Sequence, residues 1–369
     1  MPARRALVPL ALVLTASLAR AQASSGPLAA GTPTGFTVHR GTNVSHWLSQ
    51  SDRRGEERQR FLTREDVALA AKLGFDHLRI PVDEEQLWDA EGRPDAEAMG
   101  LLDAALDWCH ESGLRAIVDL HILRSHHFDA KEKPLWTEPA AQERFLACWR
   151  DLSARLRPRP LNEVAYELLN EPVADDPERW NQLVERAVQE VRRTEPGRVL
   201  VIGSNRWQSV ETFDTLRVPA GDPNLLLSFH FYTPMALTHH GAGWNKAGAF
   251  KGPVRYPGLT VDEKDLAGLP DDVAEVLRRD AKPFDRDEME RRLAKPLALA
   301  KKTGLPLYCG EWGCLPFAPR ADRLRWYADL RSVLEKNGVA WATWDYKGGF
   351  GILGPDGQED RELVDTLLK

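Results

Sequence analysis

Two kinds of hydrophobic pattern alternate along most of the chain. Short runs rich in β-branched and aromatic residues are separated by longer stretches in which apolar residues recur every three or four positions. The short runs are typical of buried strands, and the longer stretches are typical of amphipathic helices. We expect eight strands, over residues 36–44, 75–82, 115–121, 163–170, 198–203, 224–232, 305–311 and 339–346.

The stretches between the predicted strands carry helix signals. Thr63-Arg-Glu-Asp supplies an N-terminal capping signal, and Gly74 ends the apolar pattern that follows it. Further helices are expected over residues 96–112, 139–156, 177–194, 289–302, 321–337 and 360–368, with a weaker one around 206–216.

The alternation of strands and helices predicts a parallel sheet. Eight such units fit an α/β fold of the (β/α)8 TIM barrel type better than an open doubly wound sheet. The first strand is followed by Gly41-Thr-Asn-Val-Ser, which lacks a glycine-rich dinucleotide fingerprint. We expect one domain over residues 35–369. Its longest connection, residues 234–288 after the sixth strand, holds a short helical pattern at 270–279 and is expected to be a functional loop or cleft wall.

The N-terminal residues have the pattern of an export signal. Arg4 and Arg5 precede an apolar run over residues 6–18, and small residues flank a cleavage position shortly after it. This combination predicts a secretory signal peptide over residues 1–23, because the apolar run is too short to span a membrane as an anchor. Residues 24–34 are expected to form an unstructured lead-in. The protein is therefore expected to be secreted or periplasmic.

The composition is that of a folded globular protein. Of 369 residues, 43% are hydrophobic and 28% are charged, and the net charge of −6 offers no basic footprint for nucleic acid. Four cysteines are too few to hold a chain of this length, so a hydrophobic core must do so. Cys109 could pair with Cys148, and Cys309 with Cys314, or all four could be buried free thiols.

Polar residues recur where the predicted strands end. In a barrel, the C-terminal ends of the strands meet at one face and carry the reactive groups. Seven of the eight predicted strands end this way, with Asn43, Arg79, His121, Asn170 and Glu171, His230 and Tyr232, Glu311, and Trp344.

Two of these residues are glutamates. Paired carboxylates on facing strands suit glycoside hydrolysis, in which one acts as acid/base and the other as nucleophile. Glu171 lies in Asn170-Glu171-Pro172, where the proline restricts the turn and the asparagine can hydrogen-bond a sugar hydroxyl. Taken alone, Glu171 could instead be a helix cap or an ion-pair partner.

Seven short motifs occur in barrel order and carry a resemblance to a known family. They are Gly41-Thr-Asn-Val-Ser-His-Trp-Leu, Leu78-Arg-Ile-Pro, Val118-Asp-Leu-His, Leu168-Leu-Asn-Glu-Pro, Ser228-Phe-His-Phe-Tyr, Gly310-Glu-Trp-Gly and Trp344-Asp-Tyr. The chain resembles glycoside hydrolase family 5, which includes many cellulases, mannanases and related β-glycanases. The resemblance covers about residues 36–350. It implies a (β/α)8 barrel and a retaining mechanism that needs no metal or other cofactor.

The resemblance implies roles for eight of the motif residues. Glu171 matches the acid/base and Glu311 the nucleophile. The other residues would bind the sugar or tune the pair. Asn170 would contact the 2-hydroxyl of the sugar, Arg79 would hold Glu311 ionised, and His230 and Tyr232 would orient and tune the two carboxyls. His121 matches a sugar-contacting histidine, and Trp344 would stack under the same ring.

Other aromatic residues at strand ends or in the following loops are candidates for sugar stacking, because sugar rings present apolar faces that pack on aromatic rings. Plain packing in the core explains their presence equally well. These residues are Trp47, Trp136, Trp207 and Trp244.

The histidines do not form a recognised metal motif. His126-His127 and His239-His240 are adjacent pairs, whose side chains point in different directions, and no His-Glu-x-x-His is present. We expect no metal ligands. A metal-dependent hydrolase and a non-catalytic glycan-binding barrel are the alternatives from other classes.

The expected function is that of a secreted retaining endo-β-glycanase acting on β-1,4-linked glucan. A mannanase, xyloglucanase or β-1,3-glucanase of the same family is the alternative, because the fold does not decide the substrate. The expected partner is a polysaccharide or oligosaccharide, bound by a monomer that contacts neither nucleic acid nor, after signal cleavage, a membrane.

Overall fold

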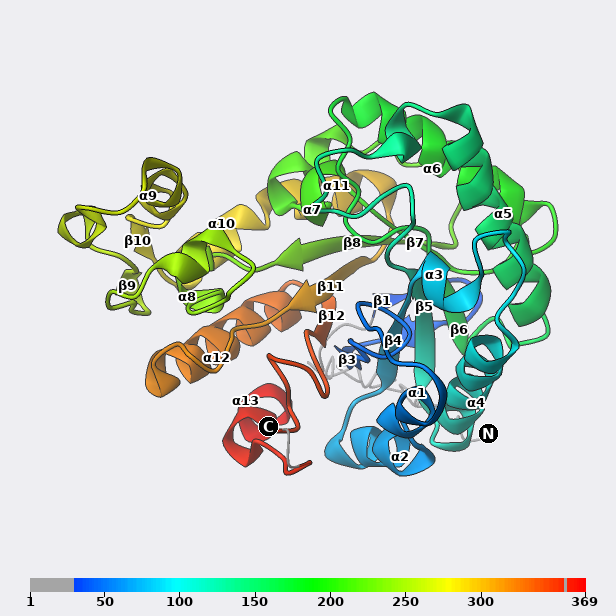
Figure 1. Cartoon of the computed structure of the whole chain (residues 1–369), viewed down its shortest axis with the longest axis horizontal. Helices are drawn as coiled ribbons and strands as arrows, with labels where there is room; N and C mark the ends of the chain where they lie inside the picture. Colours follow the sequence, from blue (N-terminus) through cyan, green and yellow to red (C-terminus); the bar gives the residue numbers. More distant parts are fainter. Residues whose placement is uncertain (1–29, 355–356) are drawn as a thin grey trace, which may run out of the picture.

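Eight parallel strands close into a barrel at the centre of the computed structural model, which describes residues 30–354 and 357–369 (Figure 1). Around the barrel, β3 follows β12 and the order continues through β4, β5, β6, β7, β8 and β11 back to β12. This arrangement confirms the expected (β/α)8 fold. The strands are β3 (Arg40–Asn43), β4 (His77–Val82), β5 (Arg115–Leu120), β6 (Val164–Glu167), β7 (Leu200–Gly203), β8 (Leu225–Phe231), β11 (Leu307–Trp312) and β12 (Ala340–Thr343).

Most barrel strands are shorter than the apolar runs that predict them. The run 163–170 contains the four-residue strand β6, and residues 168–170 continue beyond it as buried chain outside the ladder. Apolar runs report burial, and the chain stays buried past the last strand pair. Because of this, Asn170 and Glu171 lie on a turn above the barrel rather than on a strand.

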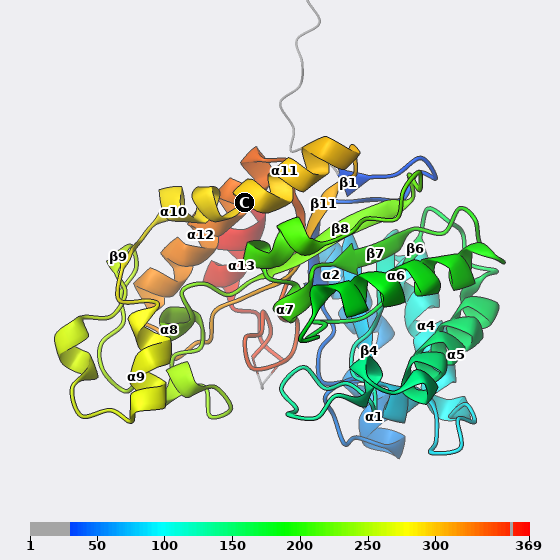
Figure 2. The same cartoon turned by 90° about the horizontal axis from the view of Figure 1, so that it is seen from above.

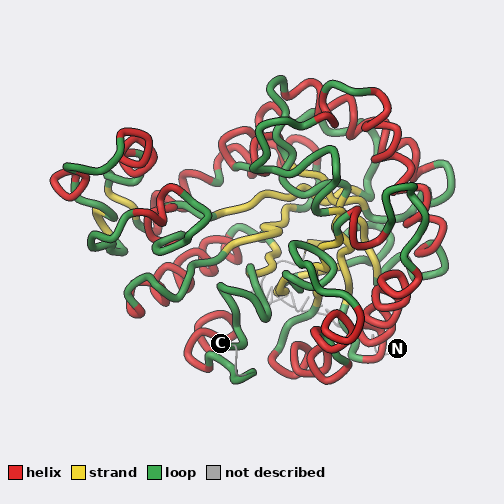
Figure 3. Tube along the Cα trace, viewed as in Figure 1, coloured by secondary structure: helices red, strands yellow, loops and turns green. Residues whose placement is uncertain are grey.

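Helices cover the outside of the barrel (Figure 3). Thr63 closes a capping box with Asp66 at the start of α2, and Gly74 ends that helix with a φ of 112°. The covering helices are α2 (Arg64–Leu73), α4 (Ala96–Glu111), α5 (Pro139–Leu156), α6 (Pro177–Arg192), α11 (Ala294–Thr303), α12 (Arg320–Lys336) and α13 (Arg361–Leu368).

Two expected helices differ in the structure. The helix predicted at 289–302 is divided into α10 (Arg286–Arg292) and α11, because Pro296 has no N–H for the carbonyl of Arg292. The weak helix around 206–216 is a short α7 (Asn205–Gln208) followed by the 3₁₀ helix η2 (Val210–Thr215). Short helices that the pattern did not predict are α1 (Gly55–Phe61), α3 (Glu84–Leu87) and η1 (Pro134–Trp136).

A small antiparallel hairpin plugs the N-terminal end of the barrel. Its strands are β1 (Ala30–Gly31) and β2 (Thr37–Val38), and Phe36 and Val38 pack against the inward-facing apolar residues at the strand starts. Residues 30–34 of the expected unstructured lead-in are therefore part of an ordered element. The expected signal peptide, residues 1–23, lies outside the described residues.

The long connection after β8 projects beside the barrel (Figures 1 and 2). Its buried residues, including Val261, Leu277 and Phe284, belong to the same hydrophobic cluster as the helical shell of the barrel. The insertion therefore packs as an extension of the main core. Its elements are α8 (Met235–Thr238), η3 (Lys246–Ala249), β9 (Gly258–Leu259), η4 (Glu263–Leu266), α9 (Asp271–Arg278) and β10 (Pro283–Phe284).

The four cysteines are buried free thiols, so of the two alternatives left open by the sequence the structure has the unpaired one. Across the described ranges 30–354 and 357–369, the helices lack the length and apolar character needed to cross a bilayer.

Candidate active site

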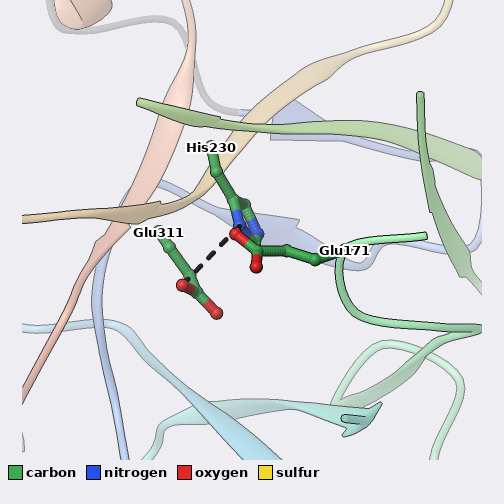
Figure 4. A group of neighbouring side chains, drawn as sticks. All are labelled: Glu171, His230 and Glu311. Carbon is green, nitrogen blue, oxygen red and sulfur yellow. Dashed lines mark hydrogen bonds and ion pairs between the residues drawn. The ribbon is translucent and has the colours of Figure 1, made fainter. Parts of the chain in front are cut away.

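Glu171 and Glu311 face each other at the C-terminal end of the barrel (Figure 4). A carboxylate oxygen of each, together with a ring nitrogen of His230, lies within a group whose atoms are all within 4.8 Å of one another. His230 Nδ1 lies 2.8 Å from Glu171 Oε1 and 3.6 Å from Glu311 Oε2. Both carboxyl side chains are largely buried, with 12% of Glu171 and 6% of Glu311 exposed.

A strained turn aims Glu171 at its partner. Its φ of 44° is unusual for a residue other than glycine, and the turn is held from both sides. The backbone N–H of Glu171 donates to Gln208 Oε1 at 3.4 Å, and its carbonyl lies 3.2 Å from His126 Nε2. His126 therefore supports this turn.

A β-bulge aims Glu311. The register between β11 and β8 shifts between Cys309 and Glu311, so Gly310 has no paired partner on β8. Asn43 Nδ2 donates to the carbonyl of Gly310 at 2.9 Å and holds the bulge in place. Bulges beside active sites commonly re-aim a side chain in this way.

Arg79 is fully buried beneath the pair and contacts three carboxylates. Its guanidinium donates to Glu311 Oε1 at 2.7 Å and makes a two-pronged contact with Glu167 at 2.6 and 3.2 Å. It also lies 3.0 Å from Asp119 Oδ2. A planar fork of this kind is well suited to holding carboxylates in a defined geometry.

Arg79 also orients the amide of Asn170. Its Nη2 donates to Asn170 Oδ1 at 2.9 Å, so the amide oxygen is engaged by the protein. This leaves the NH₂ group as the donor for a ligand hydroxyl.

The two glutamates have different electrostatic surroundings. Burial and the neighbouring Glu311 raise the pKa of Glu171 well above its usual range. Burial also raises the pKa of Glu311, but Arg79 and the Tyr232 hydroxyl, which donates to Glu311 Oε2 at 3.0 Å, oppose that rise. Glu311 is therefore the first of the pair to ionise.

The raised pKa of Glu311 corrects part of the expectation that Arg79 holds this carboxyl ionised. Arg79 does favour the ionised form of Glu311, but burial outweighs it, so the pKa of Glu311 stays above its usual value. The physical reason is that one guanidinium serves three buried carboxylates. Burial raises the pKa of Asp119, one of the three, to about 7 despite the same contact.

The two site histidines are neutral. Burial lowers the pKa of His121 to about 3, and burial with the charge of Arg79 lowers the pKa of His230 well below its usual range. His121 Nδ1 lies 2.6 Å from Asp119 Oδ2, which leaves Nε2 near Gln50 at 3.3 Å. Both rings therefore serve as hydrogen-bonding groups rather than as charges.

Trp344 follows β12 and lies against His121. The two rings stack with centroids 5.6 Å apart and 9° between their planes. The next residue, Asp345, is buried and accepts hydrogen bonds from the Ser45 hydroxyl and, at 3.1 Å, from the Gly348 N–H. Trp344 therefore lies at the C-terminal end of the barrel with 7% of its surface exposed, on a turn that these hydrogen bonds hold.

The other aromatic candidates divide into two pairs. Trp47 is completely buried and donates its ring N–H to the carbonyl of Arg58, and Trp136 is buried against His126. For these two, the stacking hypothesis is wrong because core packing covers their faces. Trp207 and Trp244 are 43% and 66% exposed, so their faces remain available to a sugar ring.

Four residues that support the site were given no role in the sequence analysis. Glu167 and Asp119 anchor Arg79, and Gln208 and Asp345 hold the turns that carry Glu171 and Trp344. A carboxylate inside an otherwise apolar strand is a usable signal, because buried charges need partners. That signal was available for Glu167 and Asp119.

Glu171, His230 and Glu311 could together coordinate a cation by distance alone. Both oxygens of Glu311 already accept hydrogen bonds, from Arg79 and from Tyr232, and a metal ion there would face the guanidinium. The donor set therefore fits a proton-transferring pair better than a metal site.

Comparison with known proteins points to one family. A family model described as cellulase (glycosyl hydrolase family 5) matches residues 31–349. Endoglucanase C of Acetivibrio thermocellus is 30% identical over 339 residues, which cover 89% of this chain and 97% of that protein. Cellodextrinase A of Ruminococcus flavefaciens is 27% identical over 307 residues, covering 82% and 84%.

Solved structures agree on the fold. Endoglucanase Cel5A from the hyperthermophilic Thermotoga maritima superposes with a TM-score of 0.73 at 24% identity, covering 89% of this chain and 96% of that one. The Clostridial cellulose synthase subunit Z from Clostridioides difficile gives the same TM-score and identity, covering 90% and 100%.

The Tyr232 contact predicts a measurable change in the charge state of Glu311. Tyr232→Phe removes a donor to the carboxylate, which destabilises the ionised form, so the pKa of Glu311 should rise by about one pH unit. Titration of ¹³C-carboxyl-labelled glutamates by NMR measures it. Tyr256→Phe is the control, because that hydroxyl donates to Asp329 instead. An unchanged pKa in the Tyr232 variant would remove this hydroxyl from the tuning of Glu311.

Proposed function

Because the chain belongs to glycosyl hydrolase family 5, we propose that it is a retaining endo-β-glycanase that cleaves β-1,4-linked glucan through a covalent intermediate on Glu311. The observation that carries the mechanism is the separation of the two carboxylates. One oxygen of Glu171 and one of Glu311 lie within 4.8 Å of each other, which supports the short carboxyl separation of retaining enzymes over the wider one of inverting enzymes.

In the first step, ionised Glu311 attacks the anomeric carbon while Glu171 gives its proton to the glycosidic oxygen. The raised pKa of Glu171 supports this role, because the acid must hold its proton until the bond breaks. The contacts of Arg79 and Tyr232 with Glu311 support the nucleophile, because they favour its charged form. The leaving sugar departs with the proton, and a glycosyl ester remains on Glu311.

In the second step, ionised Glu171 takes a proton from water, and the oxygen of that water attacks the anomeric carbon. The ester bond between that carbon and Glu311 breaks, so Glu311 leaves as a carboxylate and Glu171 is again protonated. Two inversions at the same carbon return the original β configuration. In this proposal Asn170 donates to the 2-hydroxyl of the sugar, which the contact of Arg79 with its amide oxygen supports, and Trp344 stacks under the sugar ring. His121 lines the same region.

The relatives support a β-1,4-glucan as the substrate. Two of the relatives carry the names endoglucanase and cellodextrinase, and their alignments span most of both chains. The exposed Trp207 and Trp244 add further apolar faces for a sugar chain.

Export is part of the same proposal. The signal-like residues 1–23 support a secreted or periplasmic enzyme that meets its polymer outside the cytoplasm. N-terminal sequencing of the mature protein tests this, and a retained Met1 would contradict it.

A substrate panel tests the proposed activity. We expect release of reducing sugar from carboxymethylcellulose and barley β-glucan, and little from mannan, xyloglucan, laminarin or xylan. Glu311→Ala should lower that activity by at least about a thousandfold, because the nucleophile is lost. Circular dichroism and the exposed-site variant Glu263→Ala serve as controls for folding. Activity on only one of the other polymers would contradict β-1,4-glucan as the substrate. Near-wild-type turnover in Glu311→Ala would contradict the role of Glu311 as nucleophile.

The acid/base role of Glu171 predicts a dependence on the leaving group. Glu171→Ala should slow cleavage of an unactivated cello-oligosaccharide by about 10²–10⁴-fold, because the departing oxygen then leaves without a proton. Glycosylation by a dinitrophenyl cellobioside should be nearly unaffected, since its leaving group needs no acid; the pre-steady-state burst of dinitrophenol measures it. Equal losses on both substrates would assign the proton to another residue.

A further inference from the structure

Gln50 is held beside the site in a strained backbone conformation. It lies on the loop that follows β3, and its φ of 50° is in the left-handed region, which costs free energy for a residue other than glycine. The strain persists because the backbone is fixed on both sides. The N–H of Gln50 donates to Asp83 Oδ2 at 2.6 Å, and its carbonyl lies 3.3 Å from His46 Nδ1. Asp83 is buried, so the loop is anchored to the interior of the protein.

The side chain of Gln50 reaches the ring of His121. Gln50 Nε2 lies 3.3 Å from His121 Nε2. That ring nitrogen is an acceptor, because the neutral ring donates through Nδ1 to Asp119 Oδ2 at 2.6 Å. Arg79 lies 3.0 Å from the same carboxylate oxygen, and its positive charge disfavours a proton on that oxygen in either charge state of Asp119. The NH₂ group of Gln50 therefore donates to His121.

This contact determines which group is open to a sugar. Both ring nitrogens of His121 are engaged by the protein. The amide oxygen of Gln50 accepts no hydrogen bond from the residues that the structure describes, 30–354 and 357–369. Gln50 is half-buried, and this oxygen is not sealed from solvent. The free acceptor at this position is thus the amide of Gln50 rather than the ring of His121.

The neighbours of Gln50 indicate which hydroxyl it meets. The N–H of Asn170 donates to the carbonyl of Leu120 at 3.0 Å, so His121 lies next to Asn170. Gln50 lies beyond His121 on that side of the site. His121 also stacks on Trp344, the proposed platform for the sugar ring. Where Asn170 meets the 2-hydroxyl, the next hydroxyl along the same edge of the ring is the one on C3.

We propose that Gln50 is a substrate-binding residue whose amide oxygen accepts a hydrogen bond from the 3-hydroxyl of the sugar that reacts with Glu311. His121 is then a positioning residue, because it fixes the orientation of the Gln50 amide. The inference rests on the proposed function, since it takes the contact of Asn170 with the 2-hydroxyl as its starting point.

A contact with the 3-hydroxyl distinguishes two linkages. In a β-1,4-linked chain, the reacting glucosyl unit is substituted on O4, and its 3-hydroxyl is free to donate. In a β-1,3-linked chain, O3 carries the next sugar and has no hydrogen, so the amide oxygen of Gln50 would lose its donor. A substrate that leaves a polar group of the site unpaired has a lower kcat/KM. Gln50 therefore favours β-1,4-linked glucan over β-1,3-linked glucan.

Two substitutions separate the amide from the backbone strain. Gln50→Ala removes the amide and keeps a Cβ on left-handed backbone, whereas Gln50→Gly removes the amide and relieves the strain. Both should lower kcat/KM on 2,4-dinitrophenyl β-cellobioside by about tenfold, because one neutral hydrogen bond to the sugar is lost. Gln182→Ala is the control, since that amide contacts Glu178 on the protein surface. Wild-type kcat/KM in Gln50→Gly would overturn the proposal.

A substrate without the 3-hydroxyl separates binding by Gln50 from support of His121. The wild type should lose about tenfold in kcat/KM on the analogue that is 3-deoxy in the reacting unit. Gln50→Gly should lose no more than about twofold on the same change of substrate, because its contact with that hydroxyl is already absent. Equal losses in both proteins would show that Gln50 acts through His121 alone, which would overturn the direct contact.

A measurement on the unmodified protein applies even if the variants do not fold. Barley β-glucan contains both linkages, and the oligosaccharides released from it should end in a reducing glucose substituted on O4, as methylation analysis detects. Reducing ends substituted mainly on O3 would overturn the Gln50 contact and leave the glycanase function standing. No cleavage of either barley β-glucan or carboxymethylcellulose would overturn the proposed function, and the Gln50 contact with it.

Discussion

The site depends on one buried cation. Arg79 lies inside the barrel and is shared by Asp119, Glu167 and Glu311, which come from three other strands. A buried guanidinium is tolerated only when it is paired, and losing one partner of such a network leaves an uncompensated charge. The ion network therefore ties Glu311 to the same interactions that hold the barrel interior together. The position of Glu311 is a property of the fold rather than of a flexible loop.

Around that centre, small differences in environment give two identical side chains different chemistry. Both glutamates are buried, which favours the neutral form of each. Glu311 receives donors on both oxygens, whereas Glu171 faces the negative charge of Glu311 and a neutral His230. The proton is therefore better held by Glu171. Burial raises the pKa of both Glu171 and Glu311. The contacts of Arg79 and Tyr232 with Glu311 oppose that rise, so Glu311 loses its proton first.

Much of this architecture can be predicted from the amino-acid sequence, because the C-terminal ends of all barrel strands lie on one face. Hydrophobic periodicity predicted the eight strands of the barrel. The polar residues at the ends of the apolar runs predicted that Glu171, Glu311 and Arg79 lie together, and in the structure they do. Periodicity reports burial, so it could not separate Trp47, which packs in the core, from Trp244, which is exposed. Nor could it reveal the bulge at residue 310 or the supporting turns, because those depend on contacts between distant segments.

The division of labour between the two glutamates is tested most directly by trapping the covalent intermediate. A 2-deoxy-2-fluoro-β-cellobioside with an activated leaving group should glycosylate the protein and then hydrolyse slowly, because the fluorine destabilises both transition states. Peptide mapping by mass spectrometry should find one cellobiosyl adduct per chain, on Glu311. An adduct on another residue, or turnover with inversion and no adduct, would contradict the account.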